Sequence, residues 1–340
     1  MAILSDVPAS SIAVSAPATP PTVEDVLAAR RVLTRYLPPT PLWSYPVLNA
    51  RLGATVFIKH ENVQPTGAFK VRGGINLLAT MSEEERSRGV LSYSTGNHAQ
   101  SLAYAARLFG VRCVIVMPDP PQPVKARAVE ALGATVIAHG ATLTESREHA
   151  EQLARSSGMR LVSPGDEPAL IAGVGTAYLE ICEQASDLDV ILVPVGSGSG
   201  AAAACVVTAA LAPRCQVIAV QSAASPAAHD SWRTGSCVNR PNRTTVEGLA
   251  TGCGFALPQS LIAERLADFI LVSDAEIAAA QRVLVEHAHT LAEGAGAAAL
   301  APLLRDDHPW VGKRVAVVCS GGNASLTELT TALTSATVQE

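Results

Sequence analysis

Short runs of apolar, mostly β-branched residues alternate along the chain with longer amphipathic stretches. The runs at 55–59, 90–94, 111–117, 135–138, 190–194, 216–221, 269–272 and 314–319 predict strands. The stretches at 67–80, 98–109, 124–132 and 143–156 predict helices, and Ala- and Leu-rich segments predict further helices between the later strands. This alternation is typical of parallel sheets covered by helices, which indicates an α/β fold.

Ordered structure is expected to begin at Thr22, after two prolines. Thr22 can cap a helix, and Asp25 lies three residues later, as in a capping box. This helix should end near Tyr36, before Pro38-Pro39. Residues 1–21 are rich in Ala, Ser and Pro and lack a basic segment followed by an apolar one, so they are interpreted as a flexible tail rather than a signal peptide.

Composition excludes several classes of function. With 340 residues, 48% of them hydrophobic and 16% charged, the chain can build a substantial core. Its net charge of -5 and lack of basic blocks argue against nucleic acid, and no apolar run is long enough to span a membrane. The seven cysteines form no C-x-x-C pair, which argues against disulfides or zinc and favours the cytoplasm.

Ligands of parallel sheets bind where strands end, so the polar loops after the predicted strands are the first places to search. One such loop leads from a strand to Lys70 through the flexible Gly67. A lysine that forms a Schiff base must be partly desolvated, and the neighbouring Phe69 supplies apolar surface. Taken alone, Lys70 is better interpreted as a solvated surface charge, as most lysines are.

A second loop, Ser94-Thr95-Gly96-Asn97-His98, follows a strand and opens a helix. Backbone N–H groups at a helix N-terminus bind anions such as a substrate carboxylate. The alternative is that Ser94 or Thr95 only caps the helix.

A third loop, Gly196-Ser197-Gly198-Ser199-Gly200, lies between a strand and an Ala-rich helix, and its glycines allow the backbone to wrap a phosphate. It also fits the fingerprint of dinucleotide-binding folds. That fingerprint expects an acidic residue at the end of the next strand, where this chain has Gln221, so a nicotinamide cofactor is disfavoured.

A fourth loop, Ser320-Gly321-Gly322-Asn323, follows the last predicted strand. A hydroxyl followed by two glycines can place one short polar side chain against a flat ring, although an ordinary tight turn is the alternative. Each loop is a weak signal by itself. A lysine, an anion loop, a phosphate loop and a terminal Ser-Gly-Gly-Asn in this order form a far more specific set.

This set resembles the fold-type-II enzymes that use pyridoxal 5'-phosphate (PLP), from about residue 30 to residue 331. Residues 61–74, E-N-V-Q-P-T-G-A-F-K-V-R-G-G, are similar to the serine/threonine dehydratase and serine racemase branch. The Ser-Thr-Gly-Asn-His form also resembles dehydratases of hydroxyectoine utilisation. The resemblance implies two parallel-sheet lobes that share a cofactor cleft: a large PLP-binding domain of residues 22–85 and 160–340, and a small domain of residues 86–159. It also implies a homodimer.

The same resemblance assigns roles to the loop residues. Lys70 would carry the cofactor as a Schiff base and act as the base at the substrate Cα, with Thr95 as a second catalytic residue. Residues that would contact the cofactor are Phe69, Lys70, Asn97, Gly196, Ser197, Gly198, Ser199, Gly200, Glu247, Gly248 and Ser320, the last facing the pyridine nitrogen. Residues that would hold the substrate carboxylate are Ser94, Thr95, Gly96, Asn97 and His98. Glu293 is a weaker candidate near the cofactor, and Lys125 is expected to be solvated.

The implied reaction is the dehydration of a 3-hydroxy amino acid such as L-threonine or L-serine to a 2-oxo acid and ammonia. A racemase on the same scaffold is the alternative, because the Thr95 hydroxyl could act on the opposite face of the substrate. A non-catalytic sensor with the same fold is a third hypothesis. The presence of Lys70, Asn97 and Ser320 together argues against it, because a pure binding protein has no need of all three.

One departure from the resemblance predicts that no divalent cation binds near the phosphate loop. Many relatives are expected to use an acidic residue at the end of the following strand and an aspartate six residues later, where this chain has Gln221 and Ala227. Neither offers the charged oxygen that Mg²⁺ or Ca²⁺ prefers. A crystal grown with either cation should show none beside Gln221, and an ordered cation there would contradict the prediction.

Overall fold

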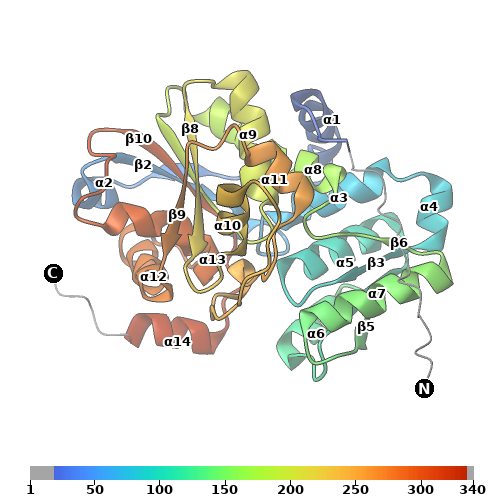
Figure 1. The fold of residues 1–340 in the computed structure, drawn as a ribbon. Coiled ribbons are helices and arrows are strands. Elements are labelled where there is room, and N and C mark those ends of the chain that lie inside the picture. The colour runs from blue at the N-terminus through green and yellow to red at the C-terminus, as the bar shows by residue number, and fades with distance from the viewer. Residues whose placement is uncertain (1–18, 335–340) are drawn as a thin grey trace, which may run out of the picture.

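The computed structural model describes residues 19–334, so most of the predicted flexible tail lies outside the described residues. Its larger sheet has the strand order β1-β2-β10-β7-β8-β9 (Figure 1). The strands are β1 (Leu42–Ser44), β2 (Thr55–His60), β7 (Val190–Pro194), β8 (Gln216–Ser222), β9 (Asp268–Val272) and β10 (Arg314–Cys319). β1 runs antiparallel to β2, and every other pairing is parallel. The parallel α/β architecture is as predicted.

The smaller sheet is wholly parallel, with the order β5-β4-β3-β6. Its strands are β3 (Val90–Tyr93), β4 (Cys113–Met117), β5 (Thr135–Ala138) and β6 (Arg160–Leu161). Because β6 pairs with β3, this domain extends past Leu161 instead of ending at residue 159. The predicted boundary was wrong because a two-residue strand leaves no apolar run in the sequence.

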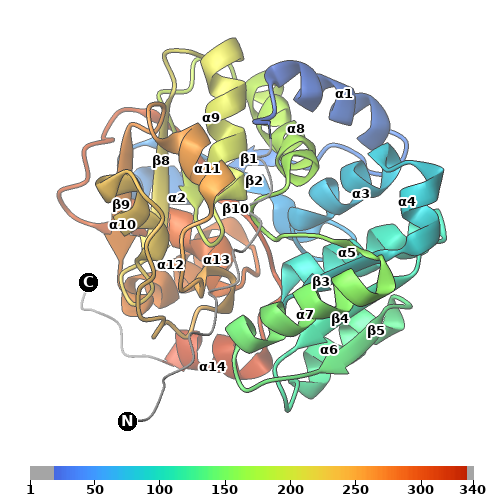
Figure 2. The same ribbon diagram turned by 45° about the vertical axis from the view of Figure 1, so that its right-hand side comes forward.

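Helices cover both sheets (Figure 2). Those beside the small sheet are α4 (Glu83–Arg88), α5 (Asn97–Phe109), α6 (Pro123–Ala131) and α7 (Leu143–Ser157). The others are α1 (Val23–Leu33), α2 (Pro46–Leu52), α3 (Lys70–Thr80), α8 (Pro168–Gln184), α9 (Ser199–Leu211), α10 (Ala227–Thr234), α11 (Ala256–Ile262), α12 (Asp274–Ala288), α13 (Gly294–Ala297) and α14 (Leu326–Thr334). Short 3₁₀ turns span Glu61–Val63, Glu247–Leu249 and Ala298–Leu304.

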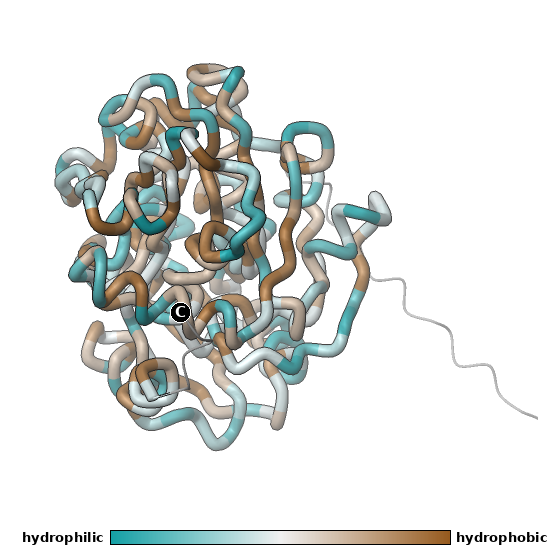
Figure 3. The backbone as a smooth tube through the Cα atoms, turned by 90° about the vertical axis from the view of Figure 1, so that its left-hand side faces the viewer, coloured by the Kyte–Doolittle hydropathy of each residue, from teal (hydrophilic) through white to brown (hydrophobic). Residues whose placement is uncertain are grey.

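The large sheet is buried on both faces, as its apolar strands require. In β7, Ile191 and Val193 belong to the core under α8 and α9, whereas Val190 and Leu192 belong to the core under α12. Figure 3 shows the hydropathy along the backbone, with apolar segments running through the interior. Among the described residues, no helix is both long and apolar enough to cross a membrane.

Helix α3 joins the two domains because it packs against both α5 and α8. Glycines permit this close approach. A Cβ atom added to Gly173 would lie 2.5 Å from the carbonyl oxygen of Arg72, and one added to Gly74 would lie 2.7 Å from that of Ser101. The helix begins at Lys70 and not at Gly67, since Gly67 has a φ of +67° that a right-handed helix excludes. The Thr22–Asp25 capping box of α1 is present as predicted.

Candidate active site

Three of the four predicted loops meet at one edge of the large sheet. They follow β2, β10 and β7, which are parallel neighbours, so their carboxyl ends lie side by side. The fourth loop follows β3 of the small sheet. It reaches the same place through Asn97, whose amide contacts Glu293 and Asn323 of the large domain. The sequence therefore identified loops that the fold does bring together.

Lys70 lies half-buried at the start of α3. Its Nζ donates to Ser199 Oγ at 2.7 Å and to Ser197 Oγ at 3.3 Å, and it lies 5.3 Å from the centre of the Phe69 ring. Burial lowers the pKa of the Lys70 amine to about 8. About one tenth of the amine is then unprotonated at pH 7, against well under one thousandth for a lysine of ordinary pKa, and the unprotonated form is the nucleophile.

The glycine-rich loop forms a cradle at the start of α9. Gly198 is the N-cap residue and has a φ of +91°, which favours glycine. A Cβ on Gly196 would collide with the carbonyl oxygen of Gly248, which places the predicted Glu247-Gly248 segment against this loop. Free N–H groups at the helix start and two serine hydroxyls suit a phosphate.

The Ser94–Asn97 loop does not serve as a side-chain cap. The N-cap residue of α5 is Gly96, which makes no capping hydrogen bond, and Ser94 Oγ instead accepts one from Gly96 N at 3.2 Å. The alternative of a purely capping Ser94 or Thr95 is therefore wrong. The N–H groups at the start of this 13-residue helix remain suited to a carboxylate.

His98 cannot offer its side chain to a substrate. Its Nε2 contacts Ser92 Oγ at 2.9 Å, and since that hydroxyl donates its own hydrogen to Val162 O at 2.7 Å, His98 Nε2 must be the donor. Burial and the nearby charge of Lys70 lower the pKa of His98 to about 3. Any contact of His98 with a carboxylate would have to come from its backbone.

The Ser-Gly-Gly-Asn loop forms hydrogen bonds both to the Lys70 loop and to the Ser94–Asn97 loop. The Ser320 carbonyl oxygen accepts from Phe69 N at 3.0 Å, and the buried Ser320 hydroxyl donates to Ala295 O at 3.3 Å. Asn323 Nδ2 donates to Asn97 Oδ1 at 2.8 Å and also to Thr66 O at 2.8 Å. Asn323 was part of the motif but received no role in the sequence analysis.

Glu293 and Lys125 make contacts between the two domains that the sequence did not predict. Glu293 is buried, and its Oε1 accepts from Asn97 Nδ2 at 2.6 Å, which brings a carboxyl group into the site. Lys125, expected to be solvated, instead pairs with Glu247 and so links α6 of the small domain to the large domain. Both contacts join residues remote in sequence, and the only local signal was the acidic residue before an Ala-rich helix.

The positions expected to hold a divalent cation in relatives do not fit one here. Gln221 is fully buried, and its Oε1 accepts from His229 N at 3.0 Å. Ala227 begins α10 and offers no ligand. Within residues 19–334, no group of three or more His, Cys, Asp or Glu side chains is arranged to bind a metal.

Comparison with known proteins agrees with this geometry. The family model described as pyridoxal-phosphate dependent enzyme matches residues 33–321. The L-threo-3-hydroxyaspartate ammonia-lyase of Saccharomyces cerevisiae is 36% identical over 90% of this chain and 94% of its own length. The L-threonine ammonia-lyase of Thermotoga maritima is 38% identical over 89% of this chain and 75% of its own length. The solved structure of maize serine racemase has a TM-score of 0.87 at 27% identity and covers 93% of this chain and 97% of its own.

The chain therefore belongs to the pyridoxal-phosphate dependent enzymes, in the fold-type-II branch of dehydratases and racemases. The residues present fit that cofactor. The Gly196–Gly200 cradle suits its phosphate, and the Lys70 amine already reaches the hydroxyls of that cradle. Asn97 and Ser320 carry uncharged polar side chains, which contact Glu293, Asn323 and Ala295 O in this structure, and their contact with the cofactor ring stays a prediction.

Glu293 should make stability depend on pH. Burial raises the pKa of its carboxyl group to about 7, although the hydrogen bond from Asn97 opposes this. The folded state then holds a proton that the unfolded chain has already lost, so stability falls as pH rises from about 4.5 to about 7. In the cofactor-free protein, Glu293→Gln should raise the free energy of unfolding at pH 8 by up to about 3 kcal/mol relative to its effect at pH 4.

Urea unfolding at both pH values measures this difference. Glu148→Gln, on the exposed face of α7, serves as the matched control and should show no such dependence. An equal effect of Glu293→Gln at the two pH values would show that Glu293 is not protonated in the folded protein.

Proposed function

We propose that this protein is a PLP-dependent dehydratase that converts a 3-hydroxy amino acid, such as L-threonine or L-serine, to a 2-oxo acid and ammonia. The observation that carries the proposal is the placement of the Lys70 amine. It lies against the phosphate cradle of the large domain, and Asn97 brings the carboxylate loop of the small domain to the same edge. The ammonia-lyases of yeast and Thermotoga support the same reaction class.

Each loop has a role in this reaction. Lys70 would hold the cofactor through its amine, and when free it would be the base that removes the Cα proton of the substrate. The N–H groups of residues 94–97 hold the substrate carboxylate, and Thr95 borders the opposite face. When bound, the cofactor supplies the electron sink that makes the Cα proton acidic.

Ser320 favours elimination over other PLP chemistry. It would offer a bound ring nitrogen a hydroxyl instead of a carboxylate, which would leave that nitrogen neutral and the electron sink of the cofactor moderate. Moderate withdrawal suits loss of the Cα proton together with the β-hydroxyl. The Gly196–Gly200 cradle would hold the cofactor phosphate where it could supply the proton with which the β-hydroxyl leaves as water.

Racemisation is the second candidate, and the Thr95 hydroxyl is the feature that favours it. Thr95 is half-buried in the loop that opens α5 and can exchange a proton with the face of Cα opposite Lys70. The structural likeness to maize serine racemase supports this alternative.

A product assay separates these functions. Purified protein with added PLP is incubated with L-serine, L-threonine, 3-hydroxyaspartate, 3-phenylserine and their stereoisomers, and 2-oxo acid and enantiomer composition are measured. We expect oxo acid from at least one substrate and its loss, by at least about 1,000-fold, in Lys70→Ala, which removes both the imine and the base.

The other outcomes identify the alternatives. Enantiomer exchange with little oxo acid would show a racemase, and Thr95→Ala should then abolish exchange. Bound PLP without turnover of any substrate would contradict the dehydratase and favour a sensor.

We infer further that the protein works as a homodimer in the cytoplasm. All seven cysteines are free thiols, which suits a reducing compartment. Trp43, Val63 and Leu291 are 57%, 59% and 53% exposed around one cavity of the large domain, and exposed apolar surface of this kind marks protein contacts.

Light scattering of the purified enzyme should therefore give twice the mass of one chain. Trp43→Asp should shift the mass toward one chain, because it places a charge in the apolar surface. The exposed Leu211→Asp on α9 is the control and should not change the mass. A single-chain mass for the unchanged protein would overturn the inference.

A further inference from the structure

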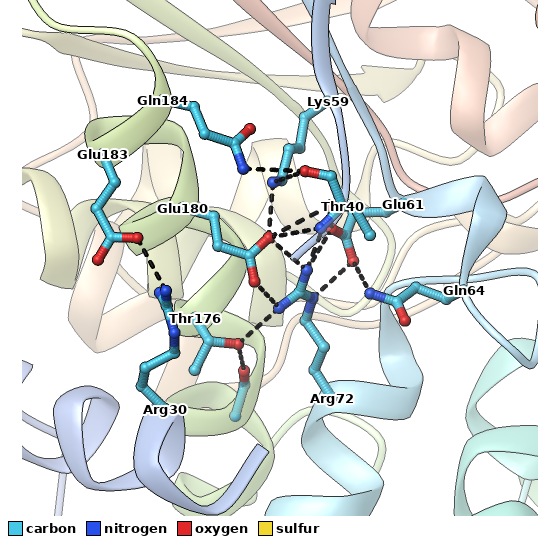
Figure 4. Close-up of polar contacts among 11 residues, drawn as sticks. Arg30, Thr40, Lys59, Glu61, Gln64, Arg72, Thr176, Glu180, Glu183 and Gln184 are labelled. Atoms are coloured by element: carbon cyan, nitrogen blue, oxygen red, sulfur yellow. Dashed lines mark hydrogen bonds and ion pairs between the residues drawn. The ribbon is translucent and has the colours of Figure 1, made fainter. Parts of the chain in front are cut away.

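Four ionised side chains are buried together beneath the first turn of α3 (Figure 4). Lys59, Glu61, Arg72 and Glu180 are 0%, 0%, 1% and 2% exposed. They come from β2, from the 3₁₀ turn after it, from α3 and from α8, respectively. Two are positive and two are negative, so the cluster as a whole is neutral.

Arg72 is the centre of this cluster. Its Nε and Nη2 donate to the two carboxylate oxygens of Glu61, each at 2.8 Å. Its Nη1 and Nη2 donate to the two oxygens of Glu180 at 2.7 and 2.8 Å. A planar guanidinium can serve two carboxylates in this way, and a lysine ammonium cannot.

Lys59 and Thr40 complete the hydrogen bonding. Lys59 Nζ donates to Glu180 Oε2 at 2.7 Å and to Thr40 O at 2.8 Å, while Thr40 N donates to Glu180 Oε2 at 3.0 Å. A buried polar network whose members are all paired is rigid, because each broken contact would leave a charge without solvent or partner.

The cluster closes the loop that carries Lys70. Glu61 stands at the beginning of that loop and Arg72 two residues after Lys70, so their ion pair joins its two ends. Helix α3 has no side-chain N-cap, which leaves its first turn to be held by other contacts. On the opposite side, Phe69 N donates to Ser320 O at 3.0 Å.

We propose that Arg72, with Glu61, Glu180 and Lys59, forms the positioning device for Lys70. The cluster fixes the first turn of α3 so that the amine lies against Ser197 and Ser199, and its two positive and two negative side chains balance. The proposal goes beyond the proposed dehydratase but rests on the role given there to Lys70.

The electrostatic surroundings of Lys70 agree with a neutral cluster. Burial is the cause that lowers the pKa of its amine, although an arginine lies two residues away. Titratable groups on the elements packed around it include Lys59, whose pKa burial lowers, with Glu61, Arg72 and Glu180 of the cluster. Tyr178 of α8 is also buried, and burial raises the pKa of its hydroxyl. His98 of α5 is neutral because its pKa is about 3. From α9, the amine meets the uncharged hydroxyl of Ser199.

Removing a negative charge from the cluster and removing a positive charge from it should therefore shift the pKa of Lys70 in opposite directions. Glu180→Gln leaves the cluster net positive and should lower the pKa of Lys70, while Lys59→Gln leaves it net negative and should raise that pKa, each by about one unit. A role in packing alone would move both variants in the same direction or neither. Arg72→Lys keeps the positive charge but loses the paired N–H donors that bind both carboxylates. It should therefore slow the capture of PLP about 10-fold or more without shifting the pKa of Lys70.

The experiment follows imine formation by absorbance when the full-length, cofactor-free protein is mixed with PLP, from about pH 6 to about pH 10. Ionisation of PLP itself is the same for every variant, so differences between variants report on Lys70. No amino-acid substrate takes part, and failure of the proposed elimination would leave this test valid.

Two control variants separate positioning from stability. Glu183→Gln, also on α8, removes the exposed pair with Arg30 and should change neither rate nor pKa. Leu284→Ala opens the core on the far face of the large sheet and should lower the unfolding temperature without shifting the Lys70 pKa.

Shifts of opposite sign for Glu180→Gln and Lys59→Gln would support the proposal, and shifts of equal sign or none would overturn it. If either variant fails to fold, Thr176→Val removes one hydrogen bond from Arg72 without any change of charge. It should slow capture of PLP, and an unchanged rate would overturn the positioning role.

Discussion

Ionised groups can be buried only where each one finds a partner and its hydrogen bonds, and this constraint shapes the centre of the molecule. Arg72 lies between two buried carboxylates, one from the turn after β2 and one from α8. The two carboxylates can meet one guanidinium only if β2, α3 and α8 take a single relative arrangement. The start of α3, and with it the place of Lys70, follows from this arrangement.

The site then results from two sheets that contribute different chemistry. Parallel neighbours β2, β10 and β7 bring the lysine, the Ser320 loop and the phosphate cradle to one edge. The small sheet contributes the N-terminus of α5, and contacts of Asn97 with Glu293 and Asn323 close the site between the domains. Helix α3 packs against both α5 of the small domain and α8 of the large domain, so it borders the parts of the site that both domains contribute.

Local patterns in the sequence were sufficient for every described strand except β1 and β6, for most helices and for the four loops. They failed where the signal is too short, as in the two-residue β6, or where backbone geometry decides, as at Gly67, whose positive φ delays α3 to Lys70. They also failed for contacts between distant residues. Arg72 and Glu180 are 108 positions apart, and nothing in either neighbourhood indicates that both are buried. The depth of Glu293 and the pairing of Lys125 are further results of tertiary packing.

The site is divided between two sheets, so different hydrophobic cores support its different loops. The phosphate cradle and the Ser320 loop rest on the two cores of the large sheet, whereas the carboxylate loop rests on the core of the small domain, which it shares with helix α3. Proteins of similar sequence are named as a hydroxyaspartate ammonia-lyase, a threonine ammonia-lyase and a serine racemase, so different reactions occur among proteins related to this chain. Because α3 carries Lys70 and packs in the small-domain core, a change in that core would reach both the carboxylate loop and the start of the lysine helix.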